Sequence, residues 1–341
     1  MKLMPRQSLT RTMIGTALIV TVLALAGCGP KPTQAPPTAV RVHLDWLHTV
    51  DAAQFYMAAD KGYYEEENLD VTVLPSGYDA DGNFIDPVEK VKTGQAEFGI
   101  IDAGYLLTAR EQGLPLVAVA AIYQRSPVAF VSLDEKNIVR PQDLVDTTVQ
   151  LTSYNEIVFE AMMISQGIDL SQVNVVERTD YTIAPLVDGE ADVIDAWVTN
   201  EVADLVLQDH EVNMVLPSDY GVVMYPNIIF CTEDTLANNP DLVERFVRAT
   251  VRGMKSAIDD PQKSAELAVS HDPEHLNLEQ QVESMRQSLP LRNPAGSRPG
   301  MMYDKDWEAT HQMLLDQGIL STSLDVNAAY TLVFLEKAYS N

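Results

Sequence analysis

Cysteine is scarce in this chain: its 341 residues include only Cys28 and Cys231. Cys231 lies in the apolar run 228–231, which predicts a buried strand residue rather than a nucleophile. The chain also lacks a Walker motif, HExxH, GxSxG and CxxC, the patterns that most readily indicate nucleotide, zinc, serine-hydrolase or thiol chemistry. We therefore expect no cofactor, no metal site and no catalytic residue.

Positive charge is scarce as well. The chain carries 23 Lys and Arg against 49 Asp and Glu, a net charge of −26. Nucleic-acid affinity depends on cations that neutralise phosphates, so this balance argues against a nucleic-acid partner. It also argues against a polyanionic ligand, because the protein would repel it.

Long apolar segments are limited to the N-terminus. Residues 13–25 are almost wholly apolar and follow three basic residues. This stretch is too short to span a bilayer comfortably and is typical of a secretory signal peptide. It ends in Leu-Ala-Gly-Cys at 25–28, which resembles a bacterial lipobox, where the thiol of Cys28 would accept a diacylglycerol. The alternatives are a plain signal peptide with an incidental cysteine and a retained transmembrane anchor.

We therefore predict a signal peptide at 1–27 and a lipidated tether at 28–39. The tether is rich in proline and nearly free of apolar residues, so it should stay extended. Loss of three basic residues with the signal peptide takes the net charge from −26 to −29. If Cys28 carries a lipid, Cys231 has no disulfide partner. The expected location is the extracytoplasmic face of the cell membrane.

The rest of the chain alternates strands with helices. The first series predicts strands at 40–45, 69–74, 96–101 and 116–123, with helices at 52–61, 87–93 and 105–112. The second predicts strands at 146–151, 173–178, 192–197, 213–216 and 228–232, with helices at 155–166, 183–187 and 201–208. A helical tail follows at 240–258, 264–269, 278–288, 304–317 and 328–339. This pattern is typical of an α/β protein with mostly parallel sheets.

Two such series and a return strand predict two lobes. We place one at 40–125 plus 228–341 and the other at 126–227, with the chain crossing near 124–126 and 225–227. Two crossings make a hinge, and a cleft between two α/β lobes is a usual place for a ligand.

Several stretches of the chain, in their order and spacing, carry a family resemblance. The first strand is followed by Leu44-Asp45-Trp46, and the next helix reads FYMAADKGYY at 55–64; further stretches lie at 91–99, 112–119, 186–193 and 240–246. Together they resemble type II periplasmic binding proteins of ABC importers, a family that binds thiamine-precursor pyrimidines, alkanesulfonates and taurine, or riboflavin. The resemblance implies a two-lobed "Venus flytrap" fold, a small-molecule ligand, and a permease and ATPase as partners.

The sequence features that would assign the chain to one branch of the family do not all agree. Trp197 with Asn200-Glu201 looks most similar to the pyrimidine-precursor branch. That branch usually continues from its first tryptophan with Thr-Pro-Asn and then an Asn-His pair, whereas this chain has LHTVDA at 47–52. The lost polar groups favour riboflavin, with a thiamine-precursor pyrimidine (formylaminopyrimidine or its hydroxymethyl relative) as the alternative. A sulfonate is less favoured, because it would call for an arginine and the candidate residues include none.

Candidate ligand-binding residues stand where strands end and helices begin, since these positions face the cleft in such folds. The first lobe offers Trp46, Asp51, Gln54, Tyr78, Asp102 and Tyr123, and the second offers Tyr154, Asn155, Trp197, Asn200, Glu201 and Tyr225. Trp46 and Trp197 could sandwich a flat ring when the lobes close.

Each candidate has a structural alternative. Trp46 could pack a loop against the core, and Tyr123, Tyr154 and Tyr225 could fill the hinge. Asp102 has the place of a helix N-cap. Glu201 could serve as an acidic first-turn residue.

Two other functional classes compete with a transport protein. Pyrimidine synthases share this fold, but they look cytoplasmic and carry a cysteine-rich motif that this chain lacks. A sensory lipoprotein would bind the same ligand without transport.

Overall fold

The computed structural model describes residues 35–79 and 81–340. The predicted signal peptide, the lipidation site at Cys28 and the tether up to residue 34 lie outside these residues. The described residues from Pro37 onward group into one compact unit. Among the helices of the described part, none has the length and apolarity needed to cross a bilayer.

The first of two sheets has the strand order β2-β1-β3-β10-β4. Its strands are β1 (Thr38–His43), β2 (Leu69–Leu74), β3 (Phe98–Ile101), β4 (Leu116–Ala121) and β10 (Ile228–Thr232). β1 pairs in parallel with β2 and β3, and β10 lies antiparallel between β3 and β4. Cys231 is fully buried in β10, as its apolar surroundings predicted.

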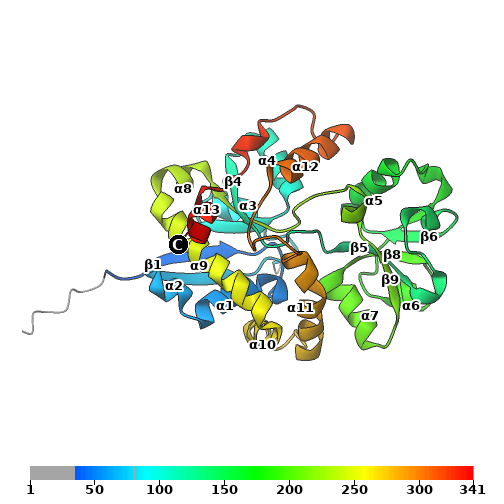
Figure 1. Cartoon of the computed structure of the whole chain (residues 1–341), viewed down its shortest axis with the longest axis horizontal. Coiled ribbons are helices and arrows are strands. Elements are labelled where there is room, and N and C mark those ends of the chain that lie inside the picture. The colour runs from blue at the N-terminus through cyan, green and yellow to red at the C-terminus, as the bar shows by residue number, and fades with distance from the viewer. Residues whose placement is uncertain (1–34, 80, 341) are drawn as a thin grey trace, which may run out of the picture. The chain divides into compact units, whose positions relative to one another are not determined.

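Helices lie on both sides of this sheet (Figure 1). Their bounds are α1 (Ala53–Asp60), α2 (Tyr63–Glu66), α3 (Pro87–Lys92), α4 (Ala103–Glu111), α8 (Glu233–Asn238), α9 (Pro240–Asp259), α10 (Pro261–His271), α11 (Leu278–Arg292), α12 (Asp304–Asp316) and α13 (Val333–Ser340). Phe246 of α9 stacks on Phe98 of β3 with ring centroids 4.0 Å apart. The aromatic face of α9 therefore anchors the helical tail to the sheet.

The second sheet has the order β7-β6-β8-β5-β9. It consists of β5 (Val128–Leu133), β6 (Thr148–Leu151), β7 (Asn174–Glu177), β8 (Val193–Trp197) and β9 (Val212–Val215), with helices α5 (Ser153–Ser165), α6 (Ala184–Val187) and α7 (Ala203–Leu207). β6 is parallel to β7 and β8, and β5 is antiparallel to β8 and β9. The two-sheet α/β fold predicted from the sequence is confirmed.

Short helical turns complete the chain. They are η1 (Val50–Ala52), η2 (Asp134–Lys136), η3 (Pro141–Leu144), η4 (Leu170–Gln172), the π-helical η5 (Val198–Val202), η6 (Pro217–Tyr220) and η7 (Val326–Ala328).

The structure differs most clearly from the sequence prediction at one missed strand and at the starts of two predicted helices. The sequence analysis missed β5, because its short apolar run follows Pro127 at a crossing and resembles a connecting loop. The helix predicted at 201–208 is preceded by the π-helical η5 and reaches α-geometry only at Ala203. The helix predicted from residue 328 begins at Val333, because residues before it form η7 and a bridge from Tyr330 to the first sheet.

The chain crosses between the sheets twice, from β4 to β5 and from β9 to β10. Helix α11 provides a third connection, since it packs against η1 beside the first sheet and against η5 and α7 beside the second. Within this contact, Ser284 Oγ donates to the carbonyl of Thr199 at 2.5 Å. The division into lobes at 40–125 plus 228–341 and 126–227 stays a prediction, and α11 shows that the tail contacts both sheets.

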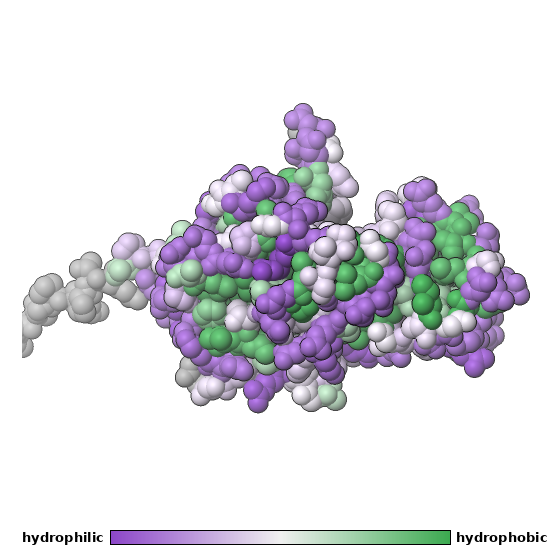
Figure 2. Space-filling view, turned by 90° about the horizontal axis from the view of Figure 1, so that it is seen from above, coloured by the Kyte–Doolittle hydropathy of each residue, from purple (hydrophilic) through white to green (hydrophobic). Residues whose placement is uncertain are grey.

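Much of the surface is hydrophilic. On the face drawn in Figure 2, hydrophilic residues cover most of the area and apolar residues gather in several separate patches. Such a distribution is ordinary for a protein surface in contact with water.

We predict that Gly253→Ala destabilises the protein. In an exposed helix this change should stabilise by about 1 kcal/mol, because alanine favours helix. Here the added Cβ would stand 2.1 Å from the Gln54 carbonyl of α1, so α9 must move away, at a cost of roughly 1–3 kcal/mol. Urea unfolding would measure it, with the exposed Lys255→Ala on the same helix as control. A gain in stability would show that α1 and α9 do not approach this closely.

Candidate ligand-binding site

Polar residues gather at one edge of the first sheet. β1 and β3 end at this edge, and the antiparallel β10 begins there, so Asp45, Asp102 and Asn227 follow or precede three neighbouring strands. β4 ends at the same edge, where the amide N–H of Ile122 donates to the Asn227 carbonyl at 2.8 Å, and Tyr123 follows. Such an edge of an α/β sheet is where ligands usually bind.

The second sheet presents a matching edge. β6 and β8 end there and β5 begins there, which places Tyr154 in the first turn of α5 and Thr199 in η5. Two hydrogen bonds join the edges: the Tyr154 hydroxyl donates to Asp102 Oδ2 at 3.0 Å, and the Thr199 hydroxyl donates to Asp51 Oδ2 at 3.5 Å. The two edges therefore face each other.

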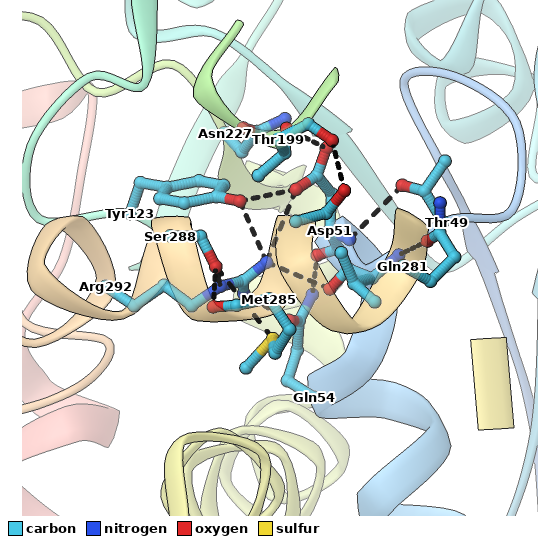
Figure 3. A network of polar contacts seen from close by, with 12 residues as sticks. Thr49, Asp51, Gln54, Tyr123, Thr199, Asn227, Gln281, Met285, Ser288 and Arg292 are labelled. Atoms are coloured by element: carbon cyan, nitrogen blue, oxygen red, sulfur yellow. Dashed lines mark hydrogen bonds and ion pairs between the residues drawn. The ribbon is translucent and has the colours of Figure 1, made fainter. Parts of the chain in front are cut away.

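A buried ion pair holds Asp51 in place (Figure 3). Arg292, at the end of α11, is 4% exposed and lies 3.3 Å from Asp51 Oδ1. Its guanidinium also donates to the Val50 carbonyl at 2.9 Å and to the Tyr123 hydroxyl at 2.8 Å. Tyr123 in turn donates to Asp51, and Arg292 lies over its ring. Every polar group of this network has a partner inside the protein, so its first role is structural.

Gln54 belongs to the same network. It is fully buried, its side-chain amide donates to the Asp51 carbonyl at 2.9 Å, and its oxygen accepts from Arg292 at 3.4 Å. Three predicted site residues, Asp51, Gln54 and Tyr123, are thus brought together.

Asp45 and Asp102 differ from Asp51 because no ion pair with a basic side chain holds them within the described ranges. Burial, together with the negative charges of Asp51 and Asp102, raises the pKa of Asp45 to about 7, against the hydrogen bond from Asn227. Burial also raises the pKa of Asp102, against the hydrogen bonds from the Tyr105 amide and the Tyr154 hydroxyl. Asp102 is the N-cap of α4, as predicted, with the Tyr105 N–H 2.7 Å from its Oδ1.

Asn227 completes this edge. It is 2% exposed and donates its amide to Asp45 Oδ2 at 2.5 Å. Its own Oδ1 is buried and finds no hydrogen-bond donor in the described part of the chain. An unsatisfied buried acceptor costs about 1–3 kcal/mol, so this atom is a natural position for a donor from outside the protein.

An exposed aromatic cluster follows β1. Trp46 stacks on Phe84 with ring centroids 6.2 Å apart and meets Tyr78 edge-on at 6.1 Å. The three rings are 46%, 44% and 67% exposed. A bridge between Tyr78 and Phe84, and a bond from the Ser76 amide to the Trp46 carbonyl at 2.9 Å, hold them together. A contiguous cluster of exposed aromatic rings marks a candidate binding surface, whereas single exposed rings are ordinary.

Several candidates near the second sheet are engaged in interactions that hold that part of the fold together. Arg178, with a side chain 1% exposed, pairs with Asp195 at 3.2 Å and with Glu201 at 3.3 Å. Glu201 also accepts from the Trp197 amide at 2.9 Å. Asn155 donates to Asp195 at 2.6 Å, and its Oδ1 has no donor within the described residues.

The remaining candidates are dispersed. Tyr225 is buried and bonded to Asp306 at 2.8 Å, and Asn200 is exposed in η5. Trp197 packs against the core of the second lobe, whereas Trp46 belongs to the exposed aromatic cluster. No ring contact joins the two tryptophans in the described structure, so the sandwich stays a prediction for the ligand-bound state.

Sequence reasoning missed four residues of this region: Asp45, Phe84, Asn227 and Arg292. Asp45 and Asn227 directly flank predicted strands, and that position could have singled them out. Arg292 gave no local signal, because it lies at the end of a tail helix more than 200 residues from Asp51. The candidate residues include no arginine, but three of them, Asp51, Gln54 and Tyr123, contact Arg292.

Two α/β sheets whose facing edges carry polar and aromatic side chains define a ligand-binding protein with the periplasmic-binding-protein fold. Residues 49–264, more than half of the chain, match the family described as NMT1/THI5 like, and the chain belongs to this family. Among solved structures, the periplasmic aliphatic sulphonate binding protein SsuA of Escherichia coli shares the fold, with a TM-score of 0.66 at 12% identity over 86% of this chain and 91% of that one.

Two curated relatives span nearly the whole chain. The riboflavin-binding protein RibY of Chloroflexus aurantiacus is 27% identical over 94% of this chain and 96% of its own length. The formylaminopyrimidine-binding protein of Halalkalibacterium halodurans is 28% identical over 86% of this chain and 90% of its own. The predicted family resemblance is confirmed, and both relatives are named as binding proteins.

We predict that Arg178→Met costs roughly 3–5 kcal/mol of unfolding free energy, because it leaves buried carboxylates unpaired. The matched control is Arg140→Met, whose side chain is 64% exposed beside Asp143; it should cost less than about 1 kcal/mol. Guanidinium unfolding would measure both. Equal effects would show that the Arg178 cluster is solvated and free to serve a ligand.

A second prediction concerns pH. The folded pKa of Asp45, about 7, lies above the ordinary 3.8, so between these values the folded state binds more protons than the unfolded state. Its contribution to stability therefore falls as pH rises through that window. Asp45→Asn should be more stable than the natural protein at pH 8, by roughly 2–4 kcal/mol, and nearly equal to it at pH 4. Urea unfolding without ligand tests this, with the exposed Asp259→Asn as control. A difference that does not change with pH would contradict the burial of Asp45.

Proposed function

We propose that this protein is a substrate-binding lipoprotein of an ABC importer and that its ligand is riboflavin. The observation that carries the choice is the exposed cluster of Trp46, Tyr78 and Phe84 next to the polar sheet edge. The likeness to a protein named as riboflavin-binding supports it.

The aromatic cluster suits a wide flat ring. The rings of Trp46 and Phe84 are nearly parallel, at 21°, and Tyr78 stands edge-on to Trp46, at 87°. A flat ring could therefore stack on the indole while its rim meets Tyr78, and the tricyclic ring of a flavin is wide enough to do both, which a single pyrimidine is not. Trp197 of the second lobe would cover the other face of the ring when the lobes close.

The polar edge suits the flavin's sugar-alcohol chain. Asp45, Asp102 and the free Oδ1 of Asn227 are hydrogen-bond acceptors, and each hydroxyl of the chain is a donor. Asn155, whose Oδ1 also lacks a donor in the described part of the protein, would add an acceptor from the second lobe.

A thiamine-precursor pyrimidine is the second candidate. Its amino group would donate to the same carboxylates, and the relative named as formylaminopyrimidine-binding favours it. The ligand in either case is small, uncharged and flat, and binding it between lobes that then dock on a permease requires no bond to change. The lipid on Cys28 would hold the protein at the extracytoplasmic face of the membrane.

We expect riboflavin to stabilise the chain from residue 29 onward, refolded to remove carried-over ligand. At a hundredfold excess over Kd, it should add about 2.7 kcal/mol to the folded state, a clear thermal shift. Trp46→Ala, Tyr78→Ala and Phe84→Ala should each weaken binding roughly tenfold. The control is Tyr181→Ala, which removes a tyrosine that is 70% exposed in the second lobe.

The outcomes separate the candidates. A shift with the aminopyrimidine precursor and none with riboflavin would move the protein to the thiamine branch. A shift with riboflavin that the three variants leave unchanged would keep the ligand but remove the aromatic cluster from the site. No shift with riboflavin, flavin mononucleotide, thiamine, pyrimidine or taurine would reject the ligand class.

A further inference from the structure

Acceptors outnumber donors at the edge of the first sheet. Asn227 uses its single amide group to donate to Asp45, and its Oδ1 is left buried without a donor in the described structure. The bond from Asn227 uses only one carboxylate oxygen of Asp45. The carboxylate of Asp102 already accepts hydrogen bonds from the Tyr105 amide and the Tyr154 hydroxyl. Whatever binds here must bring hydrogen-bond donors.

The same edge carries uncompensated negative charge. Arg292 balances Asp51, but no Lys, Arg or His within 4.0 Å balances Asp45 or Asp102 among the described residues. The carboxylates of Asp51 and Asp102 both act on Asp45, and Tyr154 faces it from the second lobe. The surrounding groups are thus carboxylates, amides and phenols, with one arginine already engaged.

We infer that this edge selects the ligand as a free alcohol and rejects its phosphate monoester. A hydroxyl supplies the donor that Asn227 Oδ1 lacks. A phosphate monoester carries about −1.5 to −2 charges already at pH 7 and brings acceptors where acceptors are in excess. Above the pKa of Asp45, about 7, it is also repelled by the carboxylates of Asp45 and Asp102. The inference rests on the proposed function, because it concerns the ligand of that same site.

A consequence for the order of reactions follows. If only the alcohol is captured, any phosphorylated form outside the cell must first lose its phosphate by phosphomonoester hydrolysis. Phosphorylation of the imported alcohol then belongs to a later, kinase-type step.

The test compares each alcohol with its phosphate ester in the protein from residue 29 onward, at pH 8 and low salt. The pairs are riboflavin with flavin mononucleotide, followed by flavin fluorescence, and hydroxymethyl-aminopyrimidine with its monophosphate, followed by calorimetry. We expect the ester of the bound pair to bind at least tenfold more weakly, because its negative charge would meet the carboxylates of Asp45 and Asp102.

Two variants locate the discrimination. Asp45→Asn and Asp102→Asn should each narrow the alcohol-to-ester ratio several-fold, and asparagine keeps the helix cap that Asp102 provides. Asp259→Asn removes the same charge at the exposed end of α9 and should leave the ratio unchanged.

Equal binding of alcohol and ester by the natural protein would overturn the inference and leave the proposed function intact. If Asp45→Asn, Asp102→Asn and the control all leave the alcohol-to-ester ratio unchanged, the discrimination does not come from these carboxylates, and the inference is overturned. Binding of no member of either pair would overturn the inference and the proposed ligand class together.

Discussion

The antiparallel insertion of β10 between β3 and β4 is the interaction on which the rest of the structure depends. β4 joins the first sheet only through β10, and the register that sets Ile228 beside Ile101 and Ala121 fixes where the second crossing ends. That register places Asn227 beside the end of β3, next to Asp102. It also returns the chain to the first sheet, so that the helical tail can reach back with Arg292 to Asp51.

Local patterns in the sequence were enough for most of the fold. β2 and β10 have the predicted bounds, since each is a compact β-branched run between polar residues, and α9 begins at the predicted Pro240. The sequence analysis missed β5, because over six residues after a proline the sequence of a strand resembles that of a connecting loop. The contribution of α11 to both lobes is invisible in the sequence, because its partners η1 and η5 are formed by residues far along the chain.

In the candidate site, too, local sequence patterns predicted some features and could not predict those that depend on distant residues. The position of Asp102 after an apolar run was enough to predict its role as a helix N-cap. Its hydrogen bond with Tyr154 could not be predicted in this way. Glu201 looked like a ligand residue, yet its carboxylate is engaged by Arg178 and the Trp197 amide. What decides whether a carboxylate is available is the presence of a distant arginine: Asp51, Asp195 and Glu201 each have one, and Asp45 and Asp102 do not.

The pairing of Asp45 with Asn227 affects which variants would be enriched when the protein is selected for stability alone. The empty protein carries an acceptor without a donor and a carboxyl group that burial disfavours in its charged form, so the fold gives up stability at the point where a ligand would restore it. A screen that rewards heat resistance alone would enrich replacements at these two positions. The surviving variants would be more stable but would lack the donor-seeking pair at this edge of the sheet, so libraries intended to test ligand binding should hold both residues constant.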